Sequence, residues 1–125
     1  MNGGATGLQG LRIFVVEDEA LVAMNLEMML EELGCAVVGP AMRFDAAEAM
    51  LAEGVAVDAA VLDVNVGGRP VFPLAERLAA AGIPVVFATG YGREGLAEGW
   101  ATRPVLQKPY LAADLARALR RALAD

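Results

Sequence analysis

The sequence contains no histidine and only one cysteine. The absence of histidine excludes Ser-His-Asp triads and metal sites built on imidazole. The single Cys35 cannot form a disulfide within the chain. Because it stands beside a predicted strand, we expect a buried structural thiol rather than a reactive one. This cysteine usage fits the cytoplasm.

Basic residues and long apolar runs are also scarce. Ten lysines and arginines stand against sixteen acids, and the net charge of −6 argues against nonspecific binding of nucleic acid. No apolar run is long enough to span a membrane, and no secretion signal is visible, so we expect neither nucleic acid nor membrane as a partner. The apolar share of 57% indicates one compact domain, residues 11–125, after a loose tail at residues 1–10.

Several short apolar runs end on a polar residue. The clearest is the run 59–63, which closes on Asp63 and is followed by Asn65 and a Gly-Gly pair. Such a run is typical of a buried strand in a parallel sheet that is covered on both faces. Three further runs lead into polar residues in the same way: 11–16 into Glu17 and Asp18, 83–88 into Thr89, and 105–106 into Lys108. Ligands of open α/β sheets bind outside such carboxyl ends.

Helical patterns separate the predicted strands. They cover residues 19–33, 44–51 and 70–81 and a last segment from Leu111, and residues 36–39 form one more short strand. Between 90 and 99, four glycines make any helix short, late or mobile, because each costs about 1 kcal/mol relative to alanine. The repeated β-α order predicts an α/β fold, a flavodoxin-like doubly wound (βα)5 domain with a five-stranded parallel sheet in the order 2-1-3-4-5.

In that order the first and third strands are neighbours, which brings Glu17, Asp18 and Asp63 together. Two carboxylates about 4 Å apart repel by about 4 kcal/mol at an effective dielectric near 20. Lys108 supplies only one positive charge, and oxygen ligands without histidine or cysteine suit Mg²⁺. The alternative is a surface acidic patch with one salt bridge, which does not explain why the polar groups all fall at strand ends.

A metal-bound acid beside a lysine and a hydroxyl is typical of phosphoryl transfer, in which cations neutralise the moving phosphoryl oxygens. A carboxylate can itself be the acceptor and form an aspartyl phosphate.

The pattern Glu17-Asp18, Asp63, Thr89 and Lys108-Pro109 resembles the receiver domain of two-component response regulators, over residues 11–124. The resemblance implies that Asp63 accepts the phosphoryl group. It also implies that Thr89 moves to bond this group, that Lys108 pairs with it, and that the Lys108-Pro109 peptide bond is cis.

The same resemblance implies a Mg²⁺ site. Asp18, Asp63 and the backbone carbonyl of Asn65 would bind the ion. Glu17 would assist, through a water bound to the metal. Glu17 stands where the commoner residue of the family is aspartate.

Residues 87–91, Phe-Ala-Thr-Gly-Tyr, resemble the signature of the FATGUY group of receivers, which often occur as single domains. Typical receivers carry an aromatic switch residue three positions before the lysine, where this sequence has Val105. Tyr91, two positions after Thr89, would take over the role of this aromatic. Thr89 and Pro109 are the other expected switch residues. Gly67 occupies a place where many relatives have proline.

The function expected from these residues is that of a stand-alone receiver. A sensor histidine kinase would phosphorylate Asp63, and output would pass by contact with a downstream protein or by relay to a phosphotransferase. One rival is an interaction module with this fold and no phosphotransfer. Others are a small hydrolase with an aspartyl-phosphate intermediate and a nucleotide binder, which would want glycines or hydroxyls in its first βα turn.

A second apolar stripe, Leu21, Met24 and Met28, lies on another face of the first predicted helix. A neighbouring helix could cover part of it. We favour a partner surface, because methionine-rich patches adapt to several partners. Its occupant would be the helical domain of the kinase or another copy of this chain, as a homodimer.

Overall fold

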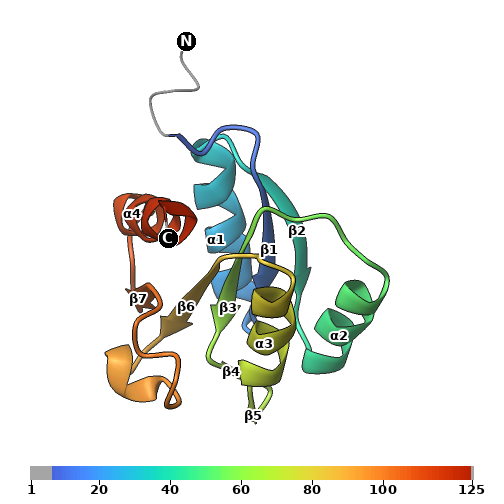
Figure 1. Cartoon of the computed structure of the whole chain (residues 1–125). Helices are drawn as coiled ribbons and strands as arrows, with labels where there is room; N and C mark the ends of the chain where they lie inside the picture. Colours follow the sequence, from blue (N-terminus) through green and yellow to red (C-terminus); the bar gives the residue numbers. More distant parts are fainter. Residues whose placement is uncertain (1–6, 125) are drawn as a thin grey trace.

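The computed structural model describes residues 7–124, which form one layered α/β unit (Figure 1). A five-stranded parallel sheet has the order β2-β1-β3-β6-β7. The strands are β1 (Arg12–Val16), β2 (Ala36–Ala41), β3 (Ala59–Asp63), β6 (Val85–Thr89) and β7 (Val105–Gln107). This is the predicted doubly wound order, because the last two of these strands are the fourth and fifth strands of the main sheet.

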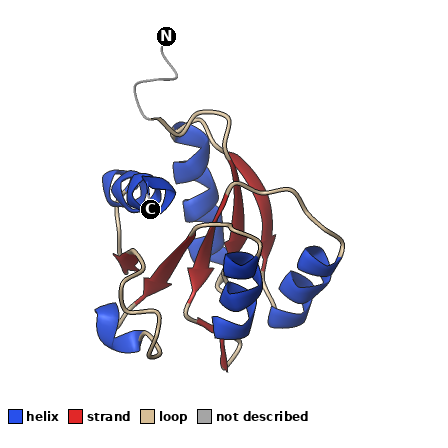
Figure 2. Cartoon of the chain, viewed as in Figure 1, coloured by secondary structure: helices blue, strands red, loops and turns tan. Residues whose placement is uncertain are grey.

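Helices cover both faces of the sheet (Figure 2). One face carries α1 (Ala20–Glu32) and α4 (Ala112–Ala124), and the other carries α2 (Phe44–Ala52) and α3 (Phe72–Ala80). Alternation along β1 divides the core, since Ile13 packs toward α1 and α4 whereas Phe14 packs toward α2 and α3. Among the described residues, no helix combines the length and the apolar character that crossing a membrane requires.

The glycine-rich segment contains no α-helix. A single 3₁₀ turn, η2 (Gly92–Gly95), stands between β6 and β7, in agreement with the short helix expected there. Trp100, farther along the same connection, packs against Phe72 and Phe87 with ring centroids 6.2 and 5.5 Å apart. The connection is therefore anchored on α3 and β6 by aromatic contacts rather than by a helix of its own.

A small hairpin follows β3 that the sequence analysis treated as a loop. It pairs β4 (Asn65–Val66) with β5 (Arg69–Pro70). Gly67 and Gly68, at its tip, have φ angles of +58° and +85°, as a tight two-residue hairpin turn requires. Because β5 takes residue 70, α3 begins at Phe72 instead of Pro70, with Pro73 in its first turn.

Two expectations for apolar residues were wrong. The loose tail was extended to residue 10, but Leu8 is fully buried in the core beside α1 and α4. Residues 1–6 lie outside the described part of the chain. Leu111 was placed on the buried face of the last helix, yet it precedes α4 and its side chain is 71% exposed, while Leu115 and Leu119 are buried as expected.

Candidate functional site

The polar residues at the strand ends meet at one edge of the sheet. Asp63 ends β3, and Glu17 and Asp18 directly follow β1, the neighbouring strand. One carboxylate oxygen from each of the three lies within 4.8 Å of the others. The parallel register accounts for this convergence, because adjacent parallel strands end at the same edge. The predicted acidic cluster is present among the described residues.

Lys108 reaches this cluster from the loop after β7. Its Nζ lies 3.0 Å from Glu17 Oε1 and 3.3 Å from Asp63 Oδ2. The Lys108 backbone N–H donates to the carbonyl of Thr89 over 2.9 Å, which fixes the loop to the end of β6. The Lys108-Pro109 bond is cis, as the resemblance implied.

The carboxyls of Glu17 and Asp63 are short of positive charge. Glu17 is only 1% exposed, and burial raises its pKa to about 7 although Lys108 acts to lower it. Burial likewise raises the pKa of Asp63, against the lowering effect of Lys108. Burial acts to lower the pKa of Lys108, but the hydrogen bond to Glu17 and the charge of Asp63 raise it on balance. One ammonium therefore does not satisfy two buried carboxylates.

Asp18 and Asn65 connect the cluster to the β4–β5 hairpin. Asp18 Oδ2 accepts a hydrogen bond from the backbone N–H of Gly67 over 2.8 Å. Asn65 Oδ1 accepts from the N–H of Gly68 over 2.9 Å, so the Asn65 side chain is used within the turn. The Asn65 N–H donates to the Asp63 carboxylate. The metal role of the Asn65 backbone carbonyl stays a prediction, and the turn uses the side chain of this residue for another purpose.

The donor set fits Mg²⁺. Glu17, Asp18 and Asp63 offer only oxygen atoms, and these lie within 4.8 Å of one another. Burial disfavours the charged form of Glu17 and raises its pKa, and a divalent cation would favour that charged form.

Thr89 ends β6 and is buried, with 3% of its surface exposed. Its Oγ1 accepts a hydrogen bond from the backbone N–H of Tyr91 over 3.0 Å. Gly95 lies against this hydroxyl, since a Cβ added there would stand 2.9 Å from Thr89 Oγ1. The Tyr91 side chain is 81% exposed. The two predicted switch residues are thus joined through the backbone of Tyr91 and not through its ring.

Two residues at this edge were missed by the sequence analysis. Tyr110, two positions after Lys108, has a buried hydroxyl without a hydrogen-bond partner among the described residues. Burial, followed by the charge of Glu17, raises the pKa of Tyr110 to about 12. Gln107, directly before the lysine, donates from Nε2 to the carbonyl of Gly90 over 3.0 Å. Their positions flanking Lys108 and Pro109 were the only available signal.

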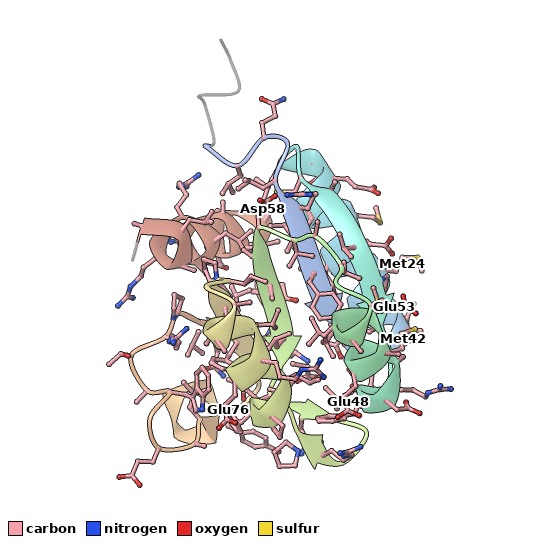
Figure 3. All side chains as sticks on the ribbon, turned by 45° about the vertical axis from the view of Figure 1, so that its right-hand side comes forward. Met24, Met42, Glu48, Glu53, Asp58 and Glu76 are labelled. Atoms are coloured by element: carbon pink, nitrogen blue, oxygen red, sulfur yellow. The ribbon has the colours of Figure 1, made fainter. Side chains whose placement is uncertain are left out.

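The apolar stripe of α1 is uncovered. Leu21, Met24 and Met28 are 78%, 51% and 55% exposed, so no described helix packs over them, and Figure 3 shows the Met24 side chain projecting outward. A groove of about 470 Å³ runs beside the stripe, and its lining includes both Leu21 and Lys108. The groove therefore extends from Leu21, the one stripe residue in its lining, to the rim of the acidic cluster.

Similarity to known proteins agrees with this geometry. The chain is 43% identical to SdrG from Sphingomonas melonis Fr1, whose solution structure it matches over 100% of both chains with a TM-score of 0.80. A structure of SdrG in its BeF3-activated conformation matches 93% of the chain with a TM-score of 0.76. A response regulator receiver protein from Sinorhizobium medicae is 25% identical, with a TM-score of 0.77 over 92% of this chain and 95% of that chain. The chain belongs to the response regulator receiver domains.

The curated relative PdtaR, a transcriptional regulatory protein of Mycobacterium tuberculosis, is 34% identical over 117 residues, 90% of this chain. The receiver spans about half the length of this relative, 56%. No protein-family model matches the sequence. Membership of the family therefore rests on these relatives, and the activity of longer relatives is not carried over with it.

We expect the free energy of unfolding of this receiver, measured without divalent cations, to fall as the pH rises from about 5 to about 8. The folded-state pKa of Glu17, about 7, lies above its ordinary value of 4.5, so the fold favours the protonated carboxyl. The stabilising contribution of this group is complete below pH 4.5 and is lost as the pH rises through about 7. The whole change amounts to about 3 kcal/mol.

Urea unfolding followed by Trp100 fluorescence at several pH values measures this change. In Glu17→Gln the decline is smaller, because glutamine does not titrate. The raised pKa of Asp63 acts in the same direction, so the variant keeps part of the slope. Identical slopes in the two proteins would contradict the assignment to Glu17.

Proposed function

We propose that this receiver accepts a phosphoryl group on Asp63 from a sensor histidine kinase, in a cytoplasmic reaction that requires Mg²⁺. The observation that carries the proposal is the position of the Lys108 ammonium, 3.3 Å from Asp63 Oδ2 and 3.0 Å from Glu17 Oε1. A nucleophilic carboxylate beside an ammonium and a cluster of further acids supports phosphoryl transfer by positioning and electrostatics.

Asp18, Asp63 and the Asn65 carbonyl would hold Mg²⁺, with Glu17 assisting, and the ion would supply positive charge to the phosphoryl oxygens. Oδ of Asp63 attacks phosphorus, the new O–P bond forms, and the N–P bond of the kinase phosphohistidine breaks with its electron pair on the imidazole. The phosphoryl group arrives with negative charge. Lys108 then leaves Glu17 and pairs with the phosphoryl oxygens.

Thr89 is the second group that changes partner. Its hydroxyl oxygen accepts from the Tyr91 N–H over 3.0 Å, and in the phosphorylated state the side chain rotates so that the hydroxyl donates to a phosphoryl oxygen. The rotation carries the oxygen away from the Tyr91 N–H, and the segment from residue 90 to η2 moves as the backbone finds another partner. Tyr91 takes the place of the usual switch aromatic, since its exposed ring can become buried. This is a population shift driven by better phosphate contacts in one state.

Output passes by protein contact or by relay of the phosphoryl group. The kinase docks its helical domain on Leu21, Met24 and Met28, because the neighbouring groove leads from this stripe to Lys108. A second copy of the chain is the alternative occupant of the same stripe.

Substitution of the acceptor tests the central claim. Labelling by a small phosphodonor such as acetyl phosphate with Mg²⁺ should be lost in Asp63→Asn, because an amide does not accept the phosphoryl group. Asp45→Asn is the matched control, since Asp45 pairs with Arg43 at the exposed start of α2, and it should label like the wild type. Persistent labelling of Asp63→Asn would refute the assignment.

Magnesium should raise the melting temperature. At about 100 times its dissociation constant, an ion that binds only the folded state contributes about 2.7 kcal/mol, which corresponds to about 10 °C for a domain of this size. Asp18→Asn should lose most of the shift, and Asp45→Asn should keep it. The absence of a shift in the wild type would favour an interaction module without phosphotransfer.

The docking role of the α1 stripe is tested by Met24→Glu combined with Met28→Glu. Charges on this surface should slow phosphotransfer from the partner kinase, identified by genomic adjacency, at least about tenfold, equivalent to about 1.4 kcal/mol. Labelling by acetyl phosphate should be unchanged. Met42→Glu is the control, because Met42 is a comparably exposed methionine outside the stripe. Unchanged kinase transfer in the double variant would remove the docking role.

A further inference from the structure

The side chain of Gln107 spans the turn that follows Thr89. Gln107 is the last residue of β7, paired in register with Thr89 of β6. Its Nε2 donates to the carbonyl oxygen of Gly90 over 3.0 Å. Its Oε1 lies against Gly92, where an added Cβ would stand only 2.8 Å away. The carboxamide thus lies against residues 90–92, which lead from the end of β6 into the first residue of η2. Figure 1 shows this segment beside β7.

Three consecutive residues of this turn are each fixed by one hydrogen bond. The Thr89 carbonyl accepts from the Lys108 N–H, the Gly90 carbonyl accepts from Gln107 Nε2, and the Tyr91 N–H donates to Thr89 Oγ1. The first bond continues the parallel ladder between β6 and β7. The second is the only one of the three that depends on a side chain from outside the turn.

The bond from Gln107 bears on the bond that must break during switching. The bond from the Tyr91 N–H holds Thr89 Oγ1 in its present orientation, and a rotation of the Thr89 side chain toward a phosphoryl group would break it. Gly90 lies between these two residues, so a hydrogen bond that holds its carbonyl opposes that movement. Gly95 also lies beside this hydroxyl, since a Cβ added there would stand 2.9 Å from Thr89 Oγ1.

We propose that Gln107 is a positioning residue of the phosphoryl site, which holds Thr89 in its resting arrangement through Gly90 and so sets the ease of switching. The proposal rests on the proposed phosphorylation of Asp63. The hydrogen bond belongs to the resting state and is broken when Thr89 engages the phosphoryl group. Both Gln107 and Gly90 are exposed, so water replaces the lost bond and the barrier to switching stays modest.

The test uses Gln107→Leu and Gln107→Glu. Neither side chain can donate to the Gly90 carbonyl at neutral pH, and only the second adds a charge. The matched control is Gln9→Leu, because Gln9 is the other glutamine of the chain and lies near Gly34, outside the site. The probe is beryllofluoride with Mg²⁺, a phosphoryl mimic. Trp100, the single tryptophan, reports binding because its ring packs on Phe87, two positions before Thr89.

Both Gln107 variants should bind beryllofluoride about fivefold more tightly than the wild type, the factor given by about 1 kcal/mol for one hydrogen bond. Labelling by acetyl phosphate should accelerate to a similar extent. Gln9→Leu should match the wild type. Thermal melting of the two Gln107 variants should fall together by a few °C at most, the shift that corresponds to about 1 kcal/mol lost from the resting fold.

Unchanged or weaker binding of beryllofluoride by Gln107→Leu would overturn the proposal. The hydrogen bond from Gln107 to Gly90 would then either have no effect on switching or be present in both states. A change in Gln107→Glu alone would also overturn it, because charge and not the lost donor would be the cause. A wild type that neither binds beryllofluoride nor labels on Asp63 would refute the proposed function itself. If the wild type binds beryllofluoride and labels on Asp63, and the Gln107 variants bind no more tightly than it does, only the role of Gln107 is refuted.

Discussion

An imbalance of charge at one edge of the sheet governs the rest of the structure. Glu17, Asp18 and Asp63 are brought within 4.8 Å of one another by parallel pairing of β1 and β3, and Lys108 is the cation that lies among them. Repulsion at this separation amounts to several kcal/mol at an effective dielectric near 20. The fold accepts it because burial of the apolar runs that precede these residues fixes where their ends must lie. A cation or a proton that neutralises one of these carboxylates therefore changes the balance of charge at the whole edge.

The connection between β6 and β7 lies next to this edge, and in the described structure it contains no α-helix. In the proposed switch Thr89 and Lys108 change partners, and the backbone between β6 and β7 is the segment that connects them. An α-helix in that position would bring a long cooperative unit, whereas η2 is one 3₁₀ turn whose glycines allow close approach to Thr89 and Gln107. Aromatic contacts of Trp100 hold the far end of the segment. In the proposed switch, the response to added charge at Asp63 would therefore be confined to the portion next to Thr89.

The fold and the acidic cluster could be predicted from the sequence because both follow from short apolar runs with polar ends. Strand order then required only right-handed crossovers. The roles of Thr89 and the cis Lys108-Pro109 bond came from resemblance to a family. The hairpin 65–70 was missed because two-residue strands carry too few side chains for a pattern, although its Gly-Gly tip is a known hairpin signal. Leu8 was missed because one apolar residue among glycines has no periodicity.

Gln107 and Tyr110 could not be found because their importance depends on three-dimensional neighbours. Gln107 reads as the polar end of a strand, and its bond to Gly90 spans 17 positions of sequence. In the sequence, Tyr110 has no feature that sets it apart from an ordinary core aromatic. Only the structure shows that its hydroxyl is buried and exposed to the charge of Glu17. Gln107 directly precedes Lys108 and Tyr110 follows two positions later, so the segment that carries the cation also carries a donor to the Gly90 carbonyl and a hydroxyl near the acids. In the proposed switch, a movement of Lys108 would therefore reach the turn after Thr89 through Gln107, its neighbour in the chain.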